Sequence, residues 1–286
     1  MKAIKSYQTA WANIWKYRFP IAFLYLANIV FTFIASSPYT IYFKQKMQHS
    51  DVLDFYEGFD ITMIGEFVNN YGQGLVPLMT LFIILVVFYY FFSIFANSAI
   101  LYAVSSQNKF IPLRSFWNGG LNYYWKIMRL SLYYILSVIC VVGFAWFVLL
   151  AVGINILEVE NDAELARKIK YALIGILILI GIFSMIKQYA KLHIATKNLP
   201  FISSSILKSG GFVIRNFLQT TLLYLINIGV LVLFFILYVN VRRVINVDAW
   251  LLTFIIAQVY LLFKIVFRIV HLDSCLTLLL KLTKKK

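Results

Sequence analysis

Residues 75–105 read LVPLMTLFIILVVFYYFFSIFANSAILYAVS, and this stretch contains no charged side chain. The hydrocarbon core of a bilayer is about 30 Å thick and a helix rises about 1.5 Å per residue, so the stretch is long enough to cross it. In lipid every backbone polar group must be satisfied internally, and a continuous, non-alternating apolar run favours a helix over a barrel strand. The stretch therefore predicts a transmembrane helix.

Five other apolar stretches have the same character, in a chain that is 62% hydrophobic and only 13% charged. A soluble domain carries about 25% charged residues. The composition predicts one all-α integral membrane domain over residues 1–286, without a disulfide framework because it has only two cysteines. The six predicted spans lie near residues 19–43, 75–105, 127–157, 170–196, 217–240 and 249–272.

The basic residues predict the orientation of these spans. With a cytoplasmic N-terminus, six spans return the C-terminus to the cytoplasm, and 19 of the 26 basic residues lie on that side. Ten of the 11 acidic residues lie on the other side, so the net charges are +18 (19 minus 1) and −3 (7 minus 10). The asymmetry predicts that both termini are cytoplasmic.

The net charge of +15 would suggest nucleic acid in a soluble protein. Here the basic residues cluster at predicted helix ends among Trp and Tyr, which is the pattern of a surface that contacts anionic lipid headgroups. No nucleic-acid motif is present. We therefore expect membrane lipids, anionic ones above all, and other membrane proteins as partners, and no nucleic acid.

A glycine pair occurs twice, as Gly119-Gly120 and, 91 residues later, as Gly210-Gly211. The same offset aligns further identities from residue 92 to 135 without a gap, which predicts an internal repeat. Each unit comprises an amphipathic interfacial segment and two spans, so the units are expected to be parallel. Their approximate bounds are residues 1–105, 106–196 and 197–286.

The four glycines have two interpretations. They act as structural hinges, that is, as a bend or a close-packing point of an interfacial helix, or they form a turn that binds a lipid headgroup. A nucleotide-binding phosphate loop is excluded because no strand precedes the pairs and no GK[ST] follows them.

Two basic pairs occur at the inner ends of predicted spans, Lys187 with Lys191 and Lys264 with Arg268. Residues four apart share a helix face. One interpretation is snorkelling of ordinary positive-inside charges toward the headgroups. The other is a shared pocket for the phosphate of an anionic lipid.

Motifs for enzymatic chemistry are missing: the sequence has no HEXXH, GXSXG, Walker or CXXC pattern. His49, His193 and His271 lie far apart without metal-ligand spacing. We therefore predict a protein that is not an enzyme and that needs no cofactor or metal. The acidic segment over residues 51–68 predicts short amphipathic helices with a solvated acidic face, or a site for a cation or a partner protein.

Residues 187–226 read KQYAKLHIATKNLPFISSSILKSGGFVIRNFLQTTLLYLI. A basic span end, a serine-rich amphipathic helix, a glycine and a basic-Asn-Phe step precede the next span. This order resembles the polytopic membrane-domain family attached to some bacterial glycerophosphoryl diester phosphodiesterases, and its stand-alone relatives. The phosphodiesterase catalytic domain is absent, so the resemblance implies a membrane-embedded helical module in a bacterial inner membrane and no catalytic residue.

Two functions fit these features. The first is a non-catalytic scaffold or accessory subunit of a bacterial envelope complex, which is favoured by apolar mid-membrane positions. The second is a transporter or flippase-like carrier of a lipid or small solute, which should contain a central cavity with convergent polar groups.

Overall fold

The computed structural model describes residues 2–47, 61–106, 110–151, 162–197, 201–244 and 250–283. These residues form helices and no strand. In chain order the elements are α1 (Lys2–Ala12), η1 (Ile14–Tyr17), α2 (Arg18–Met47), α3 (Ile61–Ser105), α4 (Leu113–Ala151), α5 (Asp162–Lys197), α6 (Ile202–Arg215), α7 (Phe217–Val244) and α8 (Trp250–Thr283).

Six of the helices, α2, α3, α4, α5, α7 and α8, are long and apolar enough to cross a membrane. The prediction of an all-α, multi-pass membrane protein is therefore confirmed. Most of the acidic segment predicted to form outer amphipathic helices, residues 51–60, lies outside the described residues.

Several predicted span limits differ from the helices. The helices α3 and α5 begin at Ile61 and Asp162, before the predicted starts at residues 75 and 170. The predicted span from residue 127 begins 14 residues earlier in α4, at Leu113, and the one that ended at Leu272 continues in α8 to Thr283. The extension of α8 is stabilised by burial, because Leu276 and Leu279 are buried there and α1 packs along this helix.

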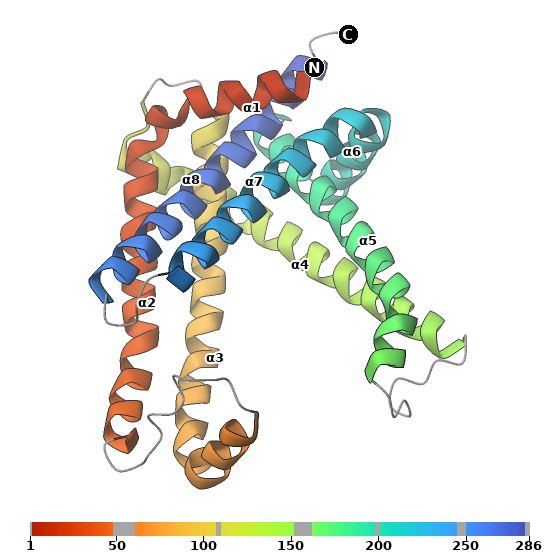
Figure 1. Cartoon of the computed structure of the whole chain (residues 1–286). Coiled ribbons are helices and arrows are strands. Elements are labelled where there is room, and N and C mark those ends of the chain that lie inside the picture. Colours follow the sequence, from red (N-terminus) through yellow and green to blue (C-terminus); the bar gives the residue numbers. More distant parts are fainter. Residues whose placement is uncertain are drawn as a thin grey trace. The chain divides into compact units, whose positions relative to one another are not determined.

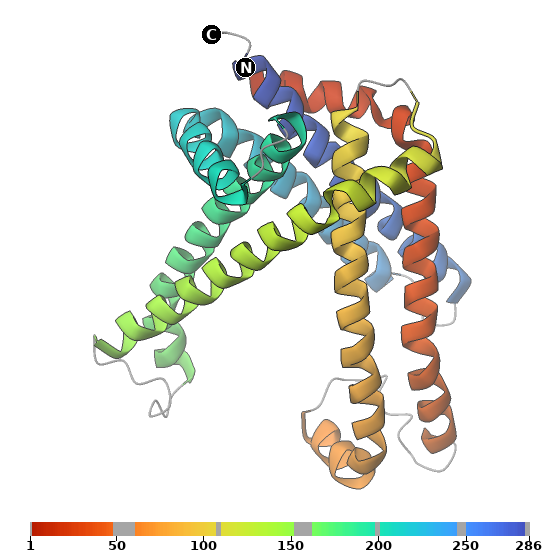
Figure 2. The same ribbon diagram turned by 180° about the vertical axis from the view of Figure 1, so that it is seen from behind.

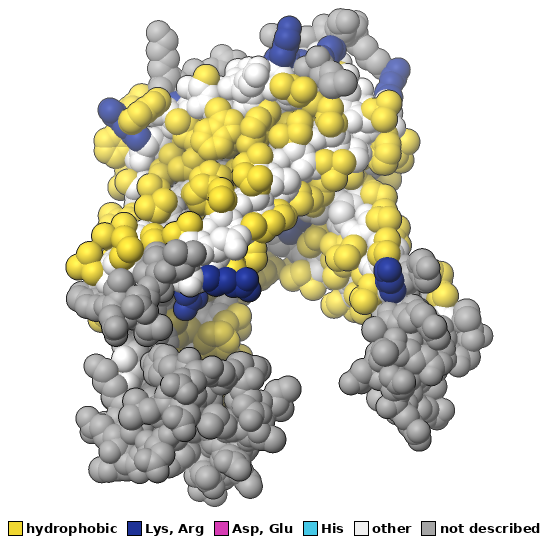
Figure 3. Space-filling model, in the orientation of Figure 1, with side chains coloured by type: hydrophobic (Ala, Val, Ile, Leu, Met, Phe, Trp, Pro, Cys, Tyr) yellow, Lys and Arg dark blue, Asp and Glu magenta, His cyan; other side chains and the backbone are white. Residues whose placement is uncertain are grey.

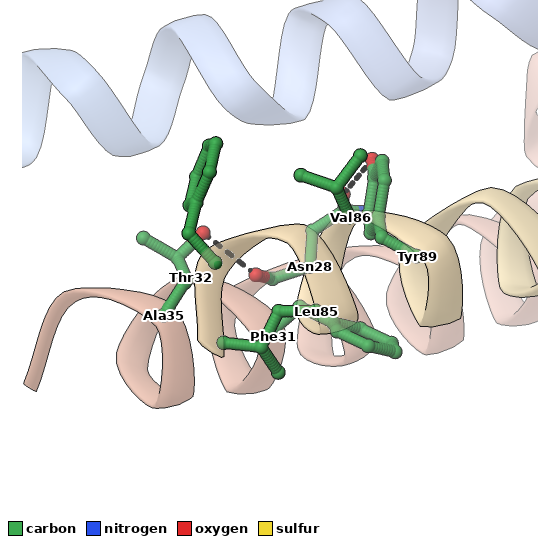
Figure 4. Close-up of a pocket in the computed structure, with 8 residues that line it drawn as sticks. Asn28, Phe31, Thr32, Ala35, Leu85, Val86 and Tyr89 are labelled. Carbon is green, nitrogen blue, oxygen red and sulfur yellow. Dashed lines mark hydrogen bonds between the residues drawn. The ribbon is translucent and has the colours of Figure 1, made fainter. Parts of the chain in front are cut away.

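The chain divides into two compact units, Ala22–Phe95 and the remainder. In the smaller unit, α2 and the first part of α3 are joined by a polar pair inside the apolar segment (Figure 4). The hydroxyl of Tyr89 donates to Oδ1 of Asn28 at 2.9 Å, while Nδ2 of Asn28 donates to the carbonyl of Leu24. The amide is thereby satisfied without water, as an apolar environment requires.

In the larger unit, α4 and α7 both run away from the end where α1 and α6 lie, and α5 and α8 return to it (Figures 1 and 2). We call this end the α1/α6 end. Parallel two-span units require α4 and α7 to leave from the same end of the unit, as they do. The residue-by-residue equivalence of the units stays a prediction.

Each short amphipathic helix packs through a stripe of small residues. In α1 the buried residues are Ala3, Ser6 and Ala10, and this helix lies on α8 and α7. In α6 they are Ser205, Ser209 and Val213, and this helix lies on α5. Small side chains allow the two backbones to approach closely.

The predicted glycine hinges lie inside continuous helices. Gly119 and Gly120 are within α4, and Gly210 and Gly211 are within α6, whereas the break between α6 and α7 falls at Asn216. A Cβ atom at Gly119 would overlap the ring and Cβ of Tyr102, while at Gly210 and Gly211 it would meet open space. Close packing is thus shown at Gly119 and not at Gly210 or Gly211. Flexing at either pair stays a prediction.

We expect Gly119→Ala to destabilise the protein by about 1–3 kcal/mol, because the body of the Tyr102 ring must move to admit a methyl group. Gly211→Ala is the matched control. It places the same methyl group in open space, and alanine favours a helix over glycine by roughly 1 kcal/mol. Thermal unfolding in detergent measures both, and equal midpoints for the two variants would contradict close packing at Gly119.

Candidate functional site

Basic side chains from α5 and α8 meet inside the larger unit. Lys187 and Lys191 lie one turn apart on α5, and Arg268 and His271 share a face of α8. Lys187 and Arg268 are close enough to Lys191 for their charges to repel it, and His271 interacts electrostatically with Lys191. We call these four residues the basic cluster.

Lys191 is the most deeply placed member, with only 6% of its surface exposed. Its ammonium group donates to Oε1 of Gln188, and at 3.4 Å this contact is long. A snorkelling lysine would keep its ammonium group in water. That alternative therefore does not describe Lys191, whose charge lies among protein side chains.

Two neighbouring side chains position the other cations. Nε of Arg268 donates to Oδ1 of Asn97 on α3 at 3.2 Å. Nζ of Lys187 lies 4.0 Å from the centre of the Tyr134 ring on α4, which is a cation–π contact. The cluster is thus held by residues of four helices.

No described carboxylate balances these charges. Asp273 is the only acidic residue whose side chain the structure describes. It lies two residues beyond His271, and at about 100° per residue it projects from nearly the opposite face of α8. There it accepts a hydrogen bond of 3.1 Å from Nδ2 of Asn13 and interacts with Lys16.

An apolar cavity of about 580 Å³ adjoins the basic cluster. This volume is within the range of small-molecule pockets. Its walls are side chains of α5 and α7, such as Leu177, Ile178 and Leu225, each more than half exposed on the outside of the unit. In a membrane such a cavity opens sideways toward lipid tails.

Two tyrosines connect the cavity to the cluster. Tyr134 lines the cavity, and its ring makes the cation–π contact with Lys187. Tyr224 also lines the cavity, and its ring contacts the ring of His271, with centroids 6.2 Å apart. The cavity and the basic cluster thus share the rings of Tyr134 and Tyr224.

Two other cavities are weaker candidates. The one beside Asn28 and Tyr89 has about 230 Å³ and a polar pair that is already hydrogen-bonded (Figure 4). The other, of about 640 Å³, lies at the α1/α6 end and is lined by Lys208 and Arg215. Both of these cations are exposed, so water compensates their charges.

Three of the four residues predicted to bind lipid come together, namely Lys187, Lys191 and Arg268. Lys264 is exposed one turn away on α8, and no contact joins it to those three among the side chains that the structure describes. His271 was not among the predicted lipid-binding residues, although positions 264, 268 and 271 form a helical stripe of basic-type residues within an apolar segment.

No protein-family model, curated protein or solved structure matches the chain. The resemblance to the membrane domains attached to phosphodiesterases therefore stays a prediction. Within the described residues, no group of three or more His, Cys, Asp or Glu side chains could hold a metal ion, and both cysteines are free.

Proposed function

We propose that this protein binds an anionic amphiphile and carries it within the membrane, with the apolar part in the cavity and the anionic head at the basic cluster. The observation that supports this proposal is Lys191, a buried cation beside two other cations, for which no described carboxylate compensates. Burying an unpaired charge is costly. An anionic ligand would remove that cost.

Of the two functions that fit the sequence, we favour the carrier over the scaffold. Apolar side chains cover the visible face of α7 and α8, with Lys and Arg at its margins (Figure 3). Any multi-pass protein presents such a surface to lipid, so it gives no separate support to a protein partner. A cavity with convergent polar groups is the feature expected of a carrier.

The test is retention of lipid by the full-length protein, purified in mild detergent and analysed by native mass spectrometry. We expect the triple variant Lys187→Gln, Lys191→Gln, Arg268→Gln to retain at least about tenfold less anionic lipid, at roughly 1 kcal/mol per basic residue. The control Lys5→Gln, Arg114→Gln, Arg129→Gln removes three exposed charges and should retain clearly more anionic lipid than the triple variant. Equal retention in both variants would contradict the proposal.

Lipid transport is tested in vesicles that contain a fluorescent anionic lipid and the reconstituted protein. The parent should accelerate the movement of this lipid between the leaflets, and the triple variant should not. Binding without acceleration in the parent would contradict the carrier function, and a co-purifying protein lost with the lipid would favour the scaffold.

We further propose that the α1/α6 end faces the cytoplasm of a bacterial cell. The charge asymmetry of the sequence supports the sidedness, and the family resemblance supports the bacterial inner membrane. We test this orientation with single cysteines, introduced one at a time into a variant that lacks Cys140 and Cys275. Ser203→Cys on α6 should react with an impermeant reagent only after permeabilisation, and Asn240→Cys near the far end of α7 should react in intact cells. The reverse pattern would contradict this orientation.

A further inference from the structure

We infer that the head group bound by the basic cluster is a phosphomonoester or a diphosphate and not a phosphodiester. This inference rests on the proposed function and names the class of ligand. It follows from the charge of the cluster and from the number of its cationic groups.

The charge of the basic cluster favours a ligand with more than one negative charge. Lys187, Lys191 and Arg268 together carry a formal charge of +3, and the one described acidic side chain, Asp273, is engaged by Asn13. A phosphodiester brings one negative charge, whereas a phosphomonoester brings about −1.5 to −2 at pH 7. Since the cations repel one another inside the protein, the ligand of higher charge compensates more of that repulsion.

The number of acceptor oxygens also favours a monoester or a diphosphate. A phosphomonoester has three terminal oxygens, a terminal diphosphate has more, and a phosphodiester has two. The cluster supplies three cationic groups from α5 and α8, so each cation can have a terminal oxygen of its own in the monoester or the diphosphate but not in the diester. Arg268 is already oriented by its bond to Asn97.

The experiment compares two lipids with identical dioleoyl chains, phosphatidic acid as the monoester and phosphatidylglycerol as the diester. Each is titrated into delipidated full-length protein in detergent, with dioleoyl phosphatidylcholine as the zwitterionic reference, and bound lipid is counted by native mass spectrometry. We expect phosphatidic acid to bind about fivefold more tightly than phosphatidylglycerol, for a difference of roughly one compensated charge, about 1 kcal/mol. In the triple glutamine variant this ratio should fall to about one.

The outcomes separate the two proposals. Equal affinity for both anionic lipids, lost in the triple variant, would overturn the head-group inference and leave the proposed function intact. A preference for phosphatidic acid that survives in the triple variant would also overturn the inference, because the cluster would not cause it. Absence of binding by either lipid would contradict the proposed function itself. Binding of inorganic phosphate as tight as that of phosphatidic acid would also contradict it, because the apolar part would then contribute nothing.

Discussion

Replacing Lys191 with Met should raise the stability of the delipidated protein by about 1–4 kcal/mol, the gain seen when buried charges are replaced by well-packed apolar residues of similar volume. Lys191 is 6% exposed, its one described hydrogen bond is long, and Lys187 and Arg268 repel it. Methionine fills a similar volume and is flexible enough to adapt. Thermal unfolding in detergent should therefore show a higher midpoint for Lys191→Met than for the parent.

The order should reverse when ligand is present. Saturating phosphatidic acid stabilises the parent by mass action, and it should raise the midpoint of Lys191→Met much less because the central cation is gone. Lys264→Met is the matched control: this lysine is exposed on α8, so its replacement should change stability by less than about 0.5 kcal/mol. If Lys191→Met lowers the midpoint without ligand, Lys191 is a structural residue and the carrier proposal loses its main support.

Replacing Asp273 with Ala should destabilise the larger unit by about 3–5 kcal/mol, the cost of removing one partner from a buried charged contact. Asp273 is 4% exposed, accepts a hydrogen bond from Asn13 and lies near Lys16 and Tyr17. Without the carboxylate, the amide of Asn13 loses its acceptor and Lys16 loses its nearby negative charge. The connection between α1 and α2 should then separate from α8.

A double-mutant cycle with Asn13→Ala tests the contact itself. Because the two side chains touch, the double variant should lose less stability than the sum of the single variants. Asp273→Asn keeps an acceptor for Asn13 and should be the milder change. Limited proteolysis should cut near α1 faster in Asp273→Ala than in the parent. Additive losses, or an unchanged cleavage rate, would contradict the role of Asp273 in holding the N-terminal segment.

The helical membrane architecture was predictable because it depends on short-range properties of the chain. An uncharged run such as residues 75–105 must satisfy its backbone within itself, and α3 ends at Ser105 as predicted. Helix ends at the membrane surface were less predictable. The last part of α8 is helical beyond Leu272 because α1 covers it, and that contact joins residues such as Lys2 and Lys281, which are 279 positions apart.

Part of the candidate site was also predictable. The spacing of Lys187 and Lys191 on one helix face, and of Lys264 and Arg268 on another, is a local property. Which of these charges are buried is not local, because it depends on the paths of neighbouring helices. Lys191 is covered and Lys264 is not, although both belong to equally spaced pairs.

The sequence by itself determined that the protein lies in a membrane and how many apolar helices it has, because both follow from composition. It also determined the face of each helix on which the basic residues lie, because that follows from the helical period. Only the tertiary structure decided that cations from two helices meet without a described carboxylate, that Asn97 holds Arg268 from 171 positions away, and that an apolar cavity lies beside them. The physical reason is that charge repulsion and burial depend on distances through space. Those distances are fixed by helix packing, which the spacing of residues along one helix does not specify.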